Sequence, residues 1–273
     1  MKKIVILFLV IFAMAMPYNE KMLQQIKTLK GENSFSFVVM GDNRDGDNVL
    51  KKIITNNNKS DVKFLINNGD LVPDGYEGQF DNYLKIIQTS QKPIISVIGN
   101  HEIPWYDGKT NYEKTFGKVD FSFVFGNSYF IILDSSAKKI SKKQFAWLKN
   151  QLKLSQNYTN RFVFTHVPLY DPREGKHHCL KKKKNAKKLN NLLDKYNITM
   201  TFCSHIHSFY RGFWHNTPYI ISGGAGAPLN KKGFYHYIKV IVNGNDVKYK
   251  IVKIKSKKPP IYREVFKEIK DVL

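Results

Sequence analysis

Two histidines stand one residue apart in the stretch TFCSHIHSFY, at positions 201–210. His205 and His207 follow an apolar, β-branched run that is typical of a buried strand. Side chains at i and i+2 of an extended chain point to the same side, about 6–7 Å apart along the strand. This spacing suits two metal ions, although a pair of surface histidines on a loop is the commoner explanation of an isolated pair.

Four further polar clusters follow apolar runs along the chain. They are GDNRDGD with Asp42, NNGDLV with Asp70, GNHE with Asn100 and His101, and THVPLY with His166. In open α/β sheets the ligand site forms beyond the carboxyl ends of the strands. We therefore expect these clusters and the two histidines to meet in one place.

The donor types in these clusters indicate a metal centre. Aspartate and asparagine offer oxygen and histidine offers nitrogen, a mixture that suits Mn, Fe or Zn and lacks the thiolates of a structural zinc site. Two divalent or trivalent ions about 3.5–4 Å apart can hold a phosphoryl group, lower the pKa of a bound water and stabilise the entering and leaving oxygens. Such a pair requires a bridging carboxylate, and Asp70, beside Gly69, is the natural candidate.

The elements that must position these residues alternate between strands and helices. Short apolar runs predict buried strands at 35–40, 62–67, 93–98, 161–166 and 198–202. Helical spacing of apolar residues predicts helices at 46–57, 76–89, 141–154 and 184–196. Two stretches, 121–134 and 236–255, predict hairpins. The expected fold class is α/β, with two mixed sheets packed face to face and helices outside.

The ordered set D-x-R, GD, GNHE, H and HxH resembles the calcineurin-like metallophosphoesterase family from residue 35 to about 255. The segments at 166–175 and 219–229 also resemble its secreted, purple-acid-phosphatase-like members. The resemblance implies a four-layer α/β/β/α sandwich of two mixed sheets. It also implies hydrolysis of phosphate esters, as a phosphatase or phosphodiesterase, by a metal-bound hydroxide at a dinuclear centre.

The resemblance assigns roles to individual residues. For the two ions it implies ligands Asp42, Asp70 and His207 for the first, with Asp70 bridging, and Asn100, His166 and His205 completing the second. His101 matches a histidine beside the leaving group, which acts as general acid or transition-state stabiliser. Glu102 is expected to orient that imidazole.

Three positions depart from the family pattern. Arg44 stands where most members have a histidine ligand, and a guanidinium cannot ligate a metal. We therefore expect weaker binding of the first ion, with Arg44 gripping a phosphate oxygen of the substrate instead. Ser204 replaces the usual glycine before HxH, which a negative φ would tolerate. Pro73 stands where purple acid phosphatases have tyrosine, so no tyrosinate–iron colour is expected.

Further substrate contacts are expected from basic residues near these motifs. Arg173, His177 and His178 lie in the segment DPREGKHHCLKKKK at 171–184, which should form a loop over the metal centre. Arg211 lies four residues beyond His207, where related proteins have a residue that lines the site.

The chain is strongly basic, with a formal net charge of +22 in 273 residues. Such an excess attracts polyanions and speeds the approach of phosphorylated substrates. We therefore expect a phosphorylated small molecule or a polyanion as substrate. Nucleic acid is an alternative partner that is not favoured, because the lysines are spread along the chain apart from runs at 181–188 and 253–258. A secreted nuclease, or a non-catalytic polyanion- or surface-binding protein, are the alternative functions.

The first fifteen residues have the layout of a secretory signal peptide, two lysines followed by an apolar run and the triplet Ala13-Met14-Ala15. An uncleaved membrane tether is the alternative, and both place the protein outside the cytoplasm, secreted or at the periplasm or cell surface. The expected organisation is a leader at 1–15, one metallophosphoesterase domain at 31–257 and a tail or helix at 258–273. Two cysteines, Cys179 and Cys203, permit but do not require a disulfide.

Overall fold

The computed structural model describes residues 16–103, 107–231 and 233–256 of the chain. The predicted leader at 1–15 and the predicted tail at 258–273 therefore lie outside the described residues. Among the helices that are described, none is long and apolar enough to cross a membrane.

The first sheet has five strands in the order β11-β10-β1-β2-β3. Their bounds are β1 Ser34–Met40, β2 Leu65–Asn67, β3 Ile94–Ser96, β10 His236–Asn243 and β11 Asp246–Lys253. β1, β2 and β3 run parallel, while β10 pairs antiparallel with both β1 and β11. The parallel strands are almost completely buried, because both faces of this part of the sheet are covered.

The second sheet has six strands in the order β4-β5-β6-β7-β9-β8. Their bounds are β4 Phe121–Phe125, β5 Ser128–Ile132, β6 Asn160–Phe164, β7 Met200–Cys203, β8 Phe209–Trp214 and β9 Thr217–Ser222. β5, β6, β7 and β9 run parallel, and the edge strands β4 and β8 are antiparallel to their neighbours. The predicted hairpins at 121–134 and 236–255 are confirmed as β4–β5 and β10–β11.

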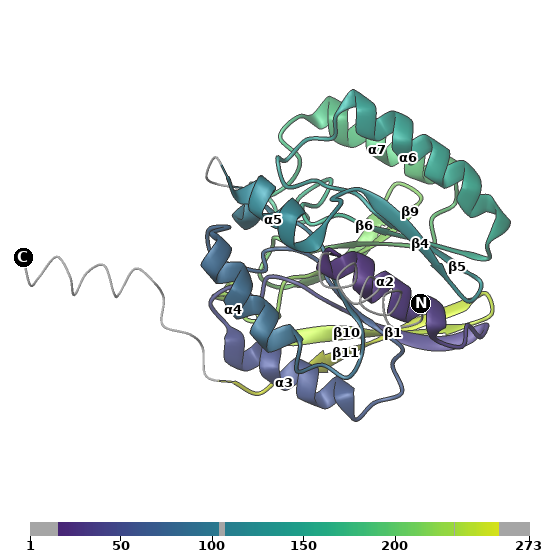
Figure 1. The fold of residues 1–273 in the computed structure, drawn as a ribbon. Coiled ribbons are helices and arrows are strands. Elements are labelled where there is room, and N and C mark those ends of the chain that lie inside the picture. Colours follow the sequence, from purple (N-terminus) through teal and green to yellow (C-terminus); the bar gives the residue numbers. More distant parts are fainter. Residues whose placement is uncertain (1–15, 104–106, 232, 257–273) are drawn as a thin grey trace, which may run out of the picture.

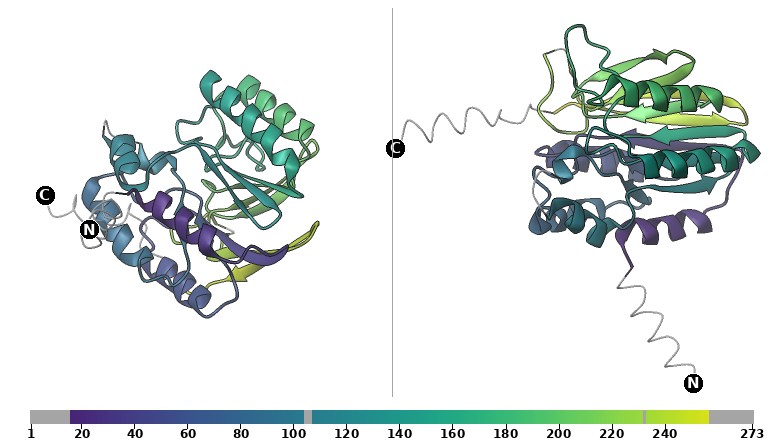
Figure 2. Two further views of the ribbon diagram at one scale, coloured as in Figure 1. Left: turned by 45° about the vertical axis from the view of Figure 1, so that its right-hand side comes forward. Right: turned by 90° about the horizontal axis from the view of Figure 1, so that it is seen from above.

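The two sheets pack face to face, with helices on their outer faces (Figures 1 and 2). Phenylalanines fill the layer between the sheets. The ring of Phe37 in β1 lies 5.3 Å, centroid to centroid, from both Phe130 in β5 and Phe162 in β6. Such ring pairs stabilise a core beyond the area they bury. The predicted α/β/β/α sandwich is confirmed.

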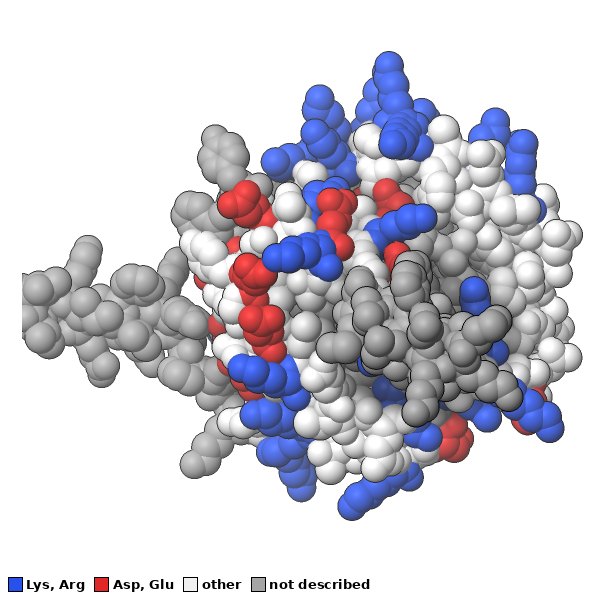
Figure 3. Space-filling model, viewed as in Figure 1, with Lys and Arg blue, Asp and Glu red and all other residues white. Residues whose placement is uncertain are grey.

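Three helices cover the first sheet: α3 Asp47–Asn58, α4 Glu77–Ile87 and α5 Gly108–Phe116. Two helices cover the second sheet: α6 Lys142–Leu154 and α7 Lys183–Lys195. The four predicted helices correspond to α3, α4, α6 and α7. The two outer layers differ in charge. Figure 3 shows lysine and arginine gathered at the top over α6 and α7, whereas at the left, over α4 and α5, acidic and basic residues are mixed.

Three features are missing from the sequence predictions: the β8–β9 hairpin, the helix α5 and the helix α2, Tyr18–Thr28. α2 packs against β3 and β4, which are edge strands of the first and second sheet. The amide of Asn19 donates to the backbone oxygen of Ser96 over 2.8 Å and accepts from its N–H over 2.9 Å. The packed part of the chain therefore begins before residue 31, where the domain was predicted to start.

Candidate metal centre

The candidate metal centre lies where parallel strands of both sheets end. Asp42 follows β1, Asp70 follows β2, and the 3₁₀ helix Asn100–Glu102 follows β3. From the other sheet, His166 follows β6 and His205 follows β7. Both sheets thus contribute donor side chains to one place, as predicted from the positions of the motifs.

One set of donors, the second ligand group, consists of Asp70, His166, His205 and Asn100. Donor atoms of the first three lie within 4.8 Å of one another. The Nε2 atom of His166 lies 3.1 Å from Oδ1 of Asp70 and 3.2 Å from Oδ1 of Asn100. The group combines one carboxylate, one amide and two imidazoles, which are ligands for a transition metal ion.

The other set, the first ligand group, consists of Asp42, Asp70 and His207. Their donor atoms also lie within 4.8 Å of one another. The Nε2 atom of His207 lies 3.6 Å from Oδ1 of Asp42. Because Asp70 belongs to both groups, its carboxylate would be the one to bridge two adjacent ions if both groups held an ion.

Backbone carbonyl groups orient three imidazoles of the centre. Nδ1 of each ring lies beside one carbonyl oxygen, at 2.9 Å for His166 and Asn68, 2.6 Å for His207 and Pro228, and 2.6 Å for His101 and Pro73. Nδ1 therefore donates a proton to the carbonyl, which leaves Nε2 facing the pocket. This arrangement is common for metal-binding histidines because it fixes both the tautomer and the ring orientation.

The ligands lie on unusual backbone. Asp42, Asp70 and His205 have φ angles of 59°, 55° and 68°, in the left-handed region that side chains other than glycine rarely adopt. Such conformations cluster at functional sites, where the surrounding structure enforces them. Gly69, before the bridging aspartate, is required there because a Cβ at that position would lie 2.5 Å from Nδ1 of His166.

The prediction that the two histidines extend from a strand on one face is wrong. β7 ends at Cys203, and the left-handed φ of His205 turns the chain before His207. The two rings consequently join different ligand groups. The N–H of His205 donates to Oδ2 of Asp42 over 2.8 Å, which joins this loop to the loop after β1.

Glu102 holds two of the ligand loops together. Its carboxylate is fully buried and accepts hydrogen bonds from four backbone N–H groups, those of Gly99, Asp70, Leu71 and Val72. Burial and the neighbouring Asp70 charge raise the pKa of Glu102 to about 8. The expectation that Glu102 orients the His101 imidazole is corrected, because the carbonyl of Pro73 does so.

The ionisation of the centre depends on Asp70. Although burial opposes its charge, the nearby His166 holds the pKa of Asp70 well below its usual range. Burial also lowers the pKa of His166, but the charge and hydrogen bond of Asp70 outweigh it and raise that pKa to about 9. When no ion is bound, a proton on Nε2 of His166 thus stabilises the carboxylate. Burial and the His166 charge lower the pKa of His205 to about 2, so this ring is neutral.

Arg44 lies inside the centre, as predicted from its position in the first motif. Its Nη1 donates to Asp45 over 2.9 Å, and its Nε lies 3.9 Å from Oδ2 of Asp70 without a hydrogen-bond partner among the described residues. The guanidinium is therefore close enough to oppose a cation in the first ligand group. It is also available to a phosphate oxygen.

Ser204 fits because of its contact with Gly41. Its φ is not positive, and its hydroxyl donates to the backbone oxygen of Ser222 over 3.1 Å. A Cβ on residue 41 would lie 2.1 Å from the Ser204 hydroxyl oxygen, so the glycine makes room for the serine.

Four residues of the ligand groups, Asp70, Asn100, His205 and His207, line a pocket of about 260 Å³. Its walls include Arg44, Asp70, Asn100, His101, Lys138, His178, His205, His207 and Asn230. His101 reaches the pocket with Nε2, which lies 3.9 Å from Oδ2 of Asp70. Sequence reasoning missed Lys138 and Asn230, since neither belongs to a motif and only folding brings them to the pocket.

The other predicted substrate residues do not line this pocket. Arg173 pairs with Asp171, with Nη2 donating over 2.8 Å and Nε over 2.9 Å. His177 lines a neighbouring cavity. Arg211 is exposed on β8 and donates to the hydroxyl of Tyr249 over 2.7 Å, because its strand forms the far edge of the second sheet. Cys179 and Cys203 are both free.

Two buried polar atoms without hydrogen-bond partners indicate whether the residues fit a pair of ions. Oδ1 of Asp42 and Nε2 of His205 have no hydrogen-bond partner among the described residues, and one lies in each ligand group. An unsatisfied buried polar group costs about 1–3 kcal/mol. An ion in each group would satisfy both atoms, and the oxygen and nitrogen donors suit Mn, Fe or Zn. The residues therefore fit the predicted pair of ions.

The fold and the site together agree with the match to a protein family. The model of the calcineurin-like phosphoesterase family matches residues 35–209, and the chain belongs to this family. The matched region contains every residue of both ligand groups.

Individual relatives are distant. The serine/threonine-protein phosphatase CPPED1 of Homo sapiens is 26% identical over 169 residues, which cover 55% of this chain and 52% of that protein. The chain thus spans about half the length of the curated relatives it matches. Among solved structures, GAP50, the anchor in the inner membrane complex of Plasmodium, is similar with a TM-score of 0.62 and 15% identity, over 84% of this chain and 87% of that one.

A putative 5′-nucleotidase from Staphylococcus aureus has a TM-score of 0.50 and 15% identity, over 87% of this chain and 58% of that one. At these identities the structural likenesses show the fold alone.

Proposed function

We propose that this protein is a metal-dependent phosphoesterase that hydrolyses phosphate esters with two ions bound by the ligand groups. The observation that carries the proposal is that two donor sets share Asp70, which itself lines the pocket. Bound ions supply a water of lowered pKa and neutralise charge on the phosphoryl oxygens.

Arg44 and His101 have separate roles in the proposed reaction. Arg44 lines the pocket with an Nε–H that has no partner among the described residues, and it can hold a phosphoryl oxygen, as guanidinium groups do in many phosphate sites. His101 lines the pocket beside Asp70 and protonates the leaving group. Because its Nδ1 proton is held by Pro73, Nε2 donates only from the doubly protonated ring.

The experiment is a panel of monoester, diester and nucleotide substrates, assayed with Mn²⁺, Zn²⁺ and Fe²⁺ added to the metal-stripped protein. We expect hydrolysis that requires added ions and is lost in Asp70→Asn. Absence of turnover on every substrate, with less than one ion per chain, would instead indicate a binding protein that kept the fold. The nuclease alternative predicts turnover of DNA that falls steeply with salt.

A further inference from the structure

A second cavity opens beside the metal pocket. It has a volume of about 560 Å³ and lies between the loop at 169–181, the start of α7 and the turn at Lys138. Lys138 lines both this cavity and the metal pocket, so the two are neighbours that share one wall. We call this cavity the Lys138 cavity.

Positive charge dominates the Lys138 cavity. Its lining contains four lysines, Lys138, Lys176, Lys181 and Lys183, together with His177. Its one carboxylate, Asp171, is already occupied, because it accepts hydrogen bonds from the Arg173 guanidinium and from the N–H of His178. No unpaired acidic group of this lining therefore opposes an anion.

The backbone holds these lysines in place. Lys138 has a φ of 56°, a conformation that is strained for lysine, and it is half-buried. Its backbone oxygen accepts from the N–H of Lys181 over 2.9 Å, which joins the turn before α6 to the segment before α7. Two lysines of the cavity are thus fixed next to each other by main-chain contact rather than gathered by chance on a flexible surface.

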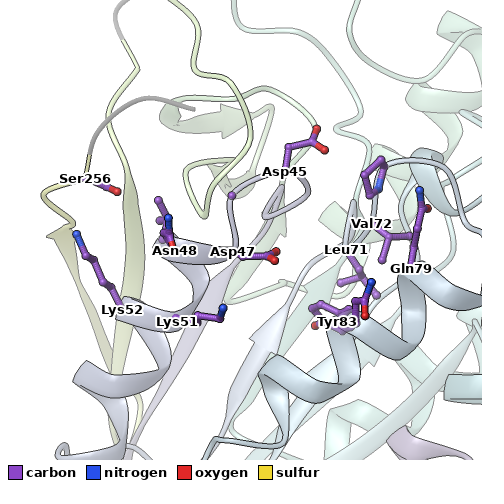
Figure 4. Close-up of a pocket in the computed structure, with 14 residues that line it drawn as sticks. Asp45, Asp47, Asn48, Lys51, Lys52, Leu71, Val72, Gln79, Tyr83 and Ser256 are labelled. Atoms are coloured by element: carbon purple, nitrogen blue, oxygen red, sulfur yellow. The ribbon is translucent and has the colours of Figure 1, made fainter. Parts of the chain in front are cut away.

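Other cavities do not combine these properties. A groove of about 1110 Å³ between α3 and α4 is larger, but Asp45 and Asp47 line it together with Lys51 and Lys52 (Figure 4). The groove between α6 and α7 has lysines without carboxylates, yet it shares no residue with the metal pocket. Of these three cavities in the described part of the chain, the Lys138 cavity alone is basic and adjoins the metal pocket.

We infer that the Lys138 cavity binds a second phosphate group of the substrate, so that the preferred substrates are phosphate esters with another phosphate within reach of the one hydrolysed. This inference rests on the proposed function. Lys138, between the two phosphates, would contact both, while Lys181 and Lys183 would contact only the second.

The test uses the full-length, Mn²⁺-loaded protein and two probes whose carbon–phosphorus bonds are not hydrolysed, butylphosphonate and butane-1,4-bisphosphonate. Calorimetry measures the dissociation constant of each. We expect the wild type to bind the bisphosphonate at least about tenfold more tightly, since each added charge contact contributes up to about 1 kcal/mol. The double variant Lys181→Gln, Lys183→Gln should lose about that factor for the bisphosphonate and less than about twofold for butylphosphonate.

A matched control is the double variant Lys187→Gln, Lys188→Gln, which makes the same charge change on exposed positions of α7 outside the cavity. It should bind both probes as the wild type does. If both double variants lose the same affinity for the bisphosphonate, a general charge effect explains the binding and the inference is overturned. The inference is also overturned if the Lys181→Gln, Lys183→Gln variant binds the bisphosphonate as tightly as the wild type. Because the readout is binding, the outcome is distinct from failure of the proposed function, which would appear as absent turnover with probe binding intact.

Discussion

The two ligand groups share Asp70 but differ in what surrounds them. The second group has four donors, Asp70, His166, His205 and Asn100, and the backbone oxygen of Asn68 accepts from Nδ1 of His166. The first group has three, Asp42, Asp70 and His207, with the Arg44 guanidinium where the family has another ligand. The Nε atom of Arg44 lies 3.9 Å from Oδ2 of Asp70. A permanent positive charge so close to a ligand opposes the binding of a cation. We therefore expect the second group to bind its ion first and more tightly.

The largest loss of turnover is expected from replacing Asp70, the residue that the two ligand groups share. Asp70→Asn deprives both ions of the bridging carboxylate, so turnover should fall about 10³-fold or more, since metal charge stabilisation is worth several kcal/mol. Steady-state kinetics and metal analysis check this expectation. Asp81→Asn, the same change at an exposed position of α4, should leave both unaltered. Near-normal turnover in Asp70→Asn would refute the bridging role.

Replacing Glu102 tests whether its carboxylate holds the loops after β2 and β3 together. Glutamine offers one oxygen in place of two and turns an amide N–H₂ toward backbone N–H groups, which leaves buried donors unpaired. Above pH 8, where the carboxylate is ionised, Glu102→Gln should lower the free energy of unfolding by about 2–3 kcal/mol. Urea denaturation measures the loss, with Glu113→Gln on the surface of α5 as control. If the two variants unfold alike, Glu102 does not support the loops.

The difference in ion affinity between the two ligand groups should become smaller when Arg44 is replaced. Arg44→His removes the charge and adds a donor, and should tighten the first ion by about tenfold. Arg44→Gln removes the charge only and should give a smaller gain. Calorimetric Mn²⁺ titrations of the two variants separate the contributions. An unchanged titration in Arg44→His would mean that the guanidinium points away from the first ion.

The affinity of the second ligand group for its ion should also depend on pH. The pKa of His166 is about 9 when no ion is bound, so below that pH an ion must displace its proton. Affinity for the more tightly bound ion should therefore rise by up to about tenfold per pH unit from pH 6 and level off near pH 9. Titrations in buffers of different ionisation enthalpy count the released protons. Affinity that is constant over this range would exclude a protonated His166.

The meeting of these donor residues could be predicted from sequence, because each motif follows an apolar run that predicts a strand. Their geometry could not, since the left-handed turns at Asp42, Asp70 and His205 depend on contacts between loops of different sheets. α2 was missed because its residues directly follow an apolar leader pattern. The β8–β9 hairpin was missed because its turn, His215-Asn216, lacks the usual glycine.

Substrate residues were the least predictable part of the site. Arg173 and Arg211 are basic and close in sequence to the motifs, but each has a partner elsewhere, Asp171 and Tyr249 respectively. Lys138 lies 28 residues before His166 and reaches the pocket through a strained turn that no local pattern indicates. Long-range packing, rather than sequence spacing, decides which cations face the metal centre.

Anomalous diffraction from crystals of the Mn²⁺-loaded protein tests the central claim most directly, because it locates ions without assuming their ligands. The structure predicts two peaks about 3.5–4 Å apart that share the carboxylate of Asp70, with the higher occupancy beside His166 and His205. Peaks elsewhere, or no peak in contact with Asp70 at saturating Mn²⁺, would contradict it.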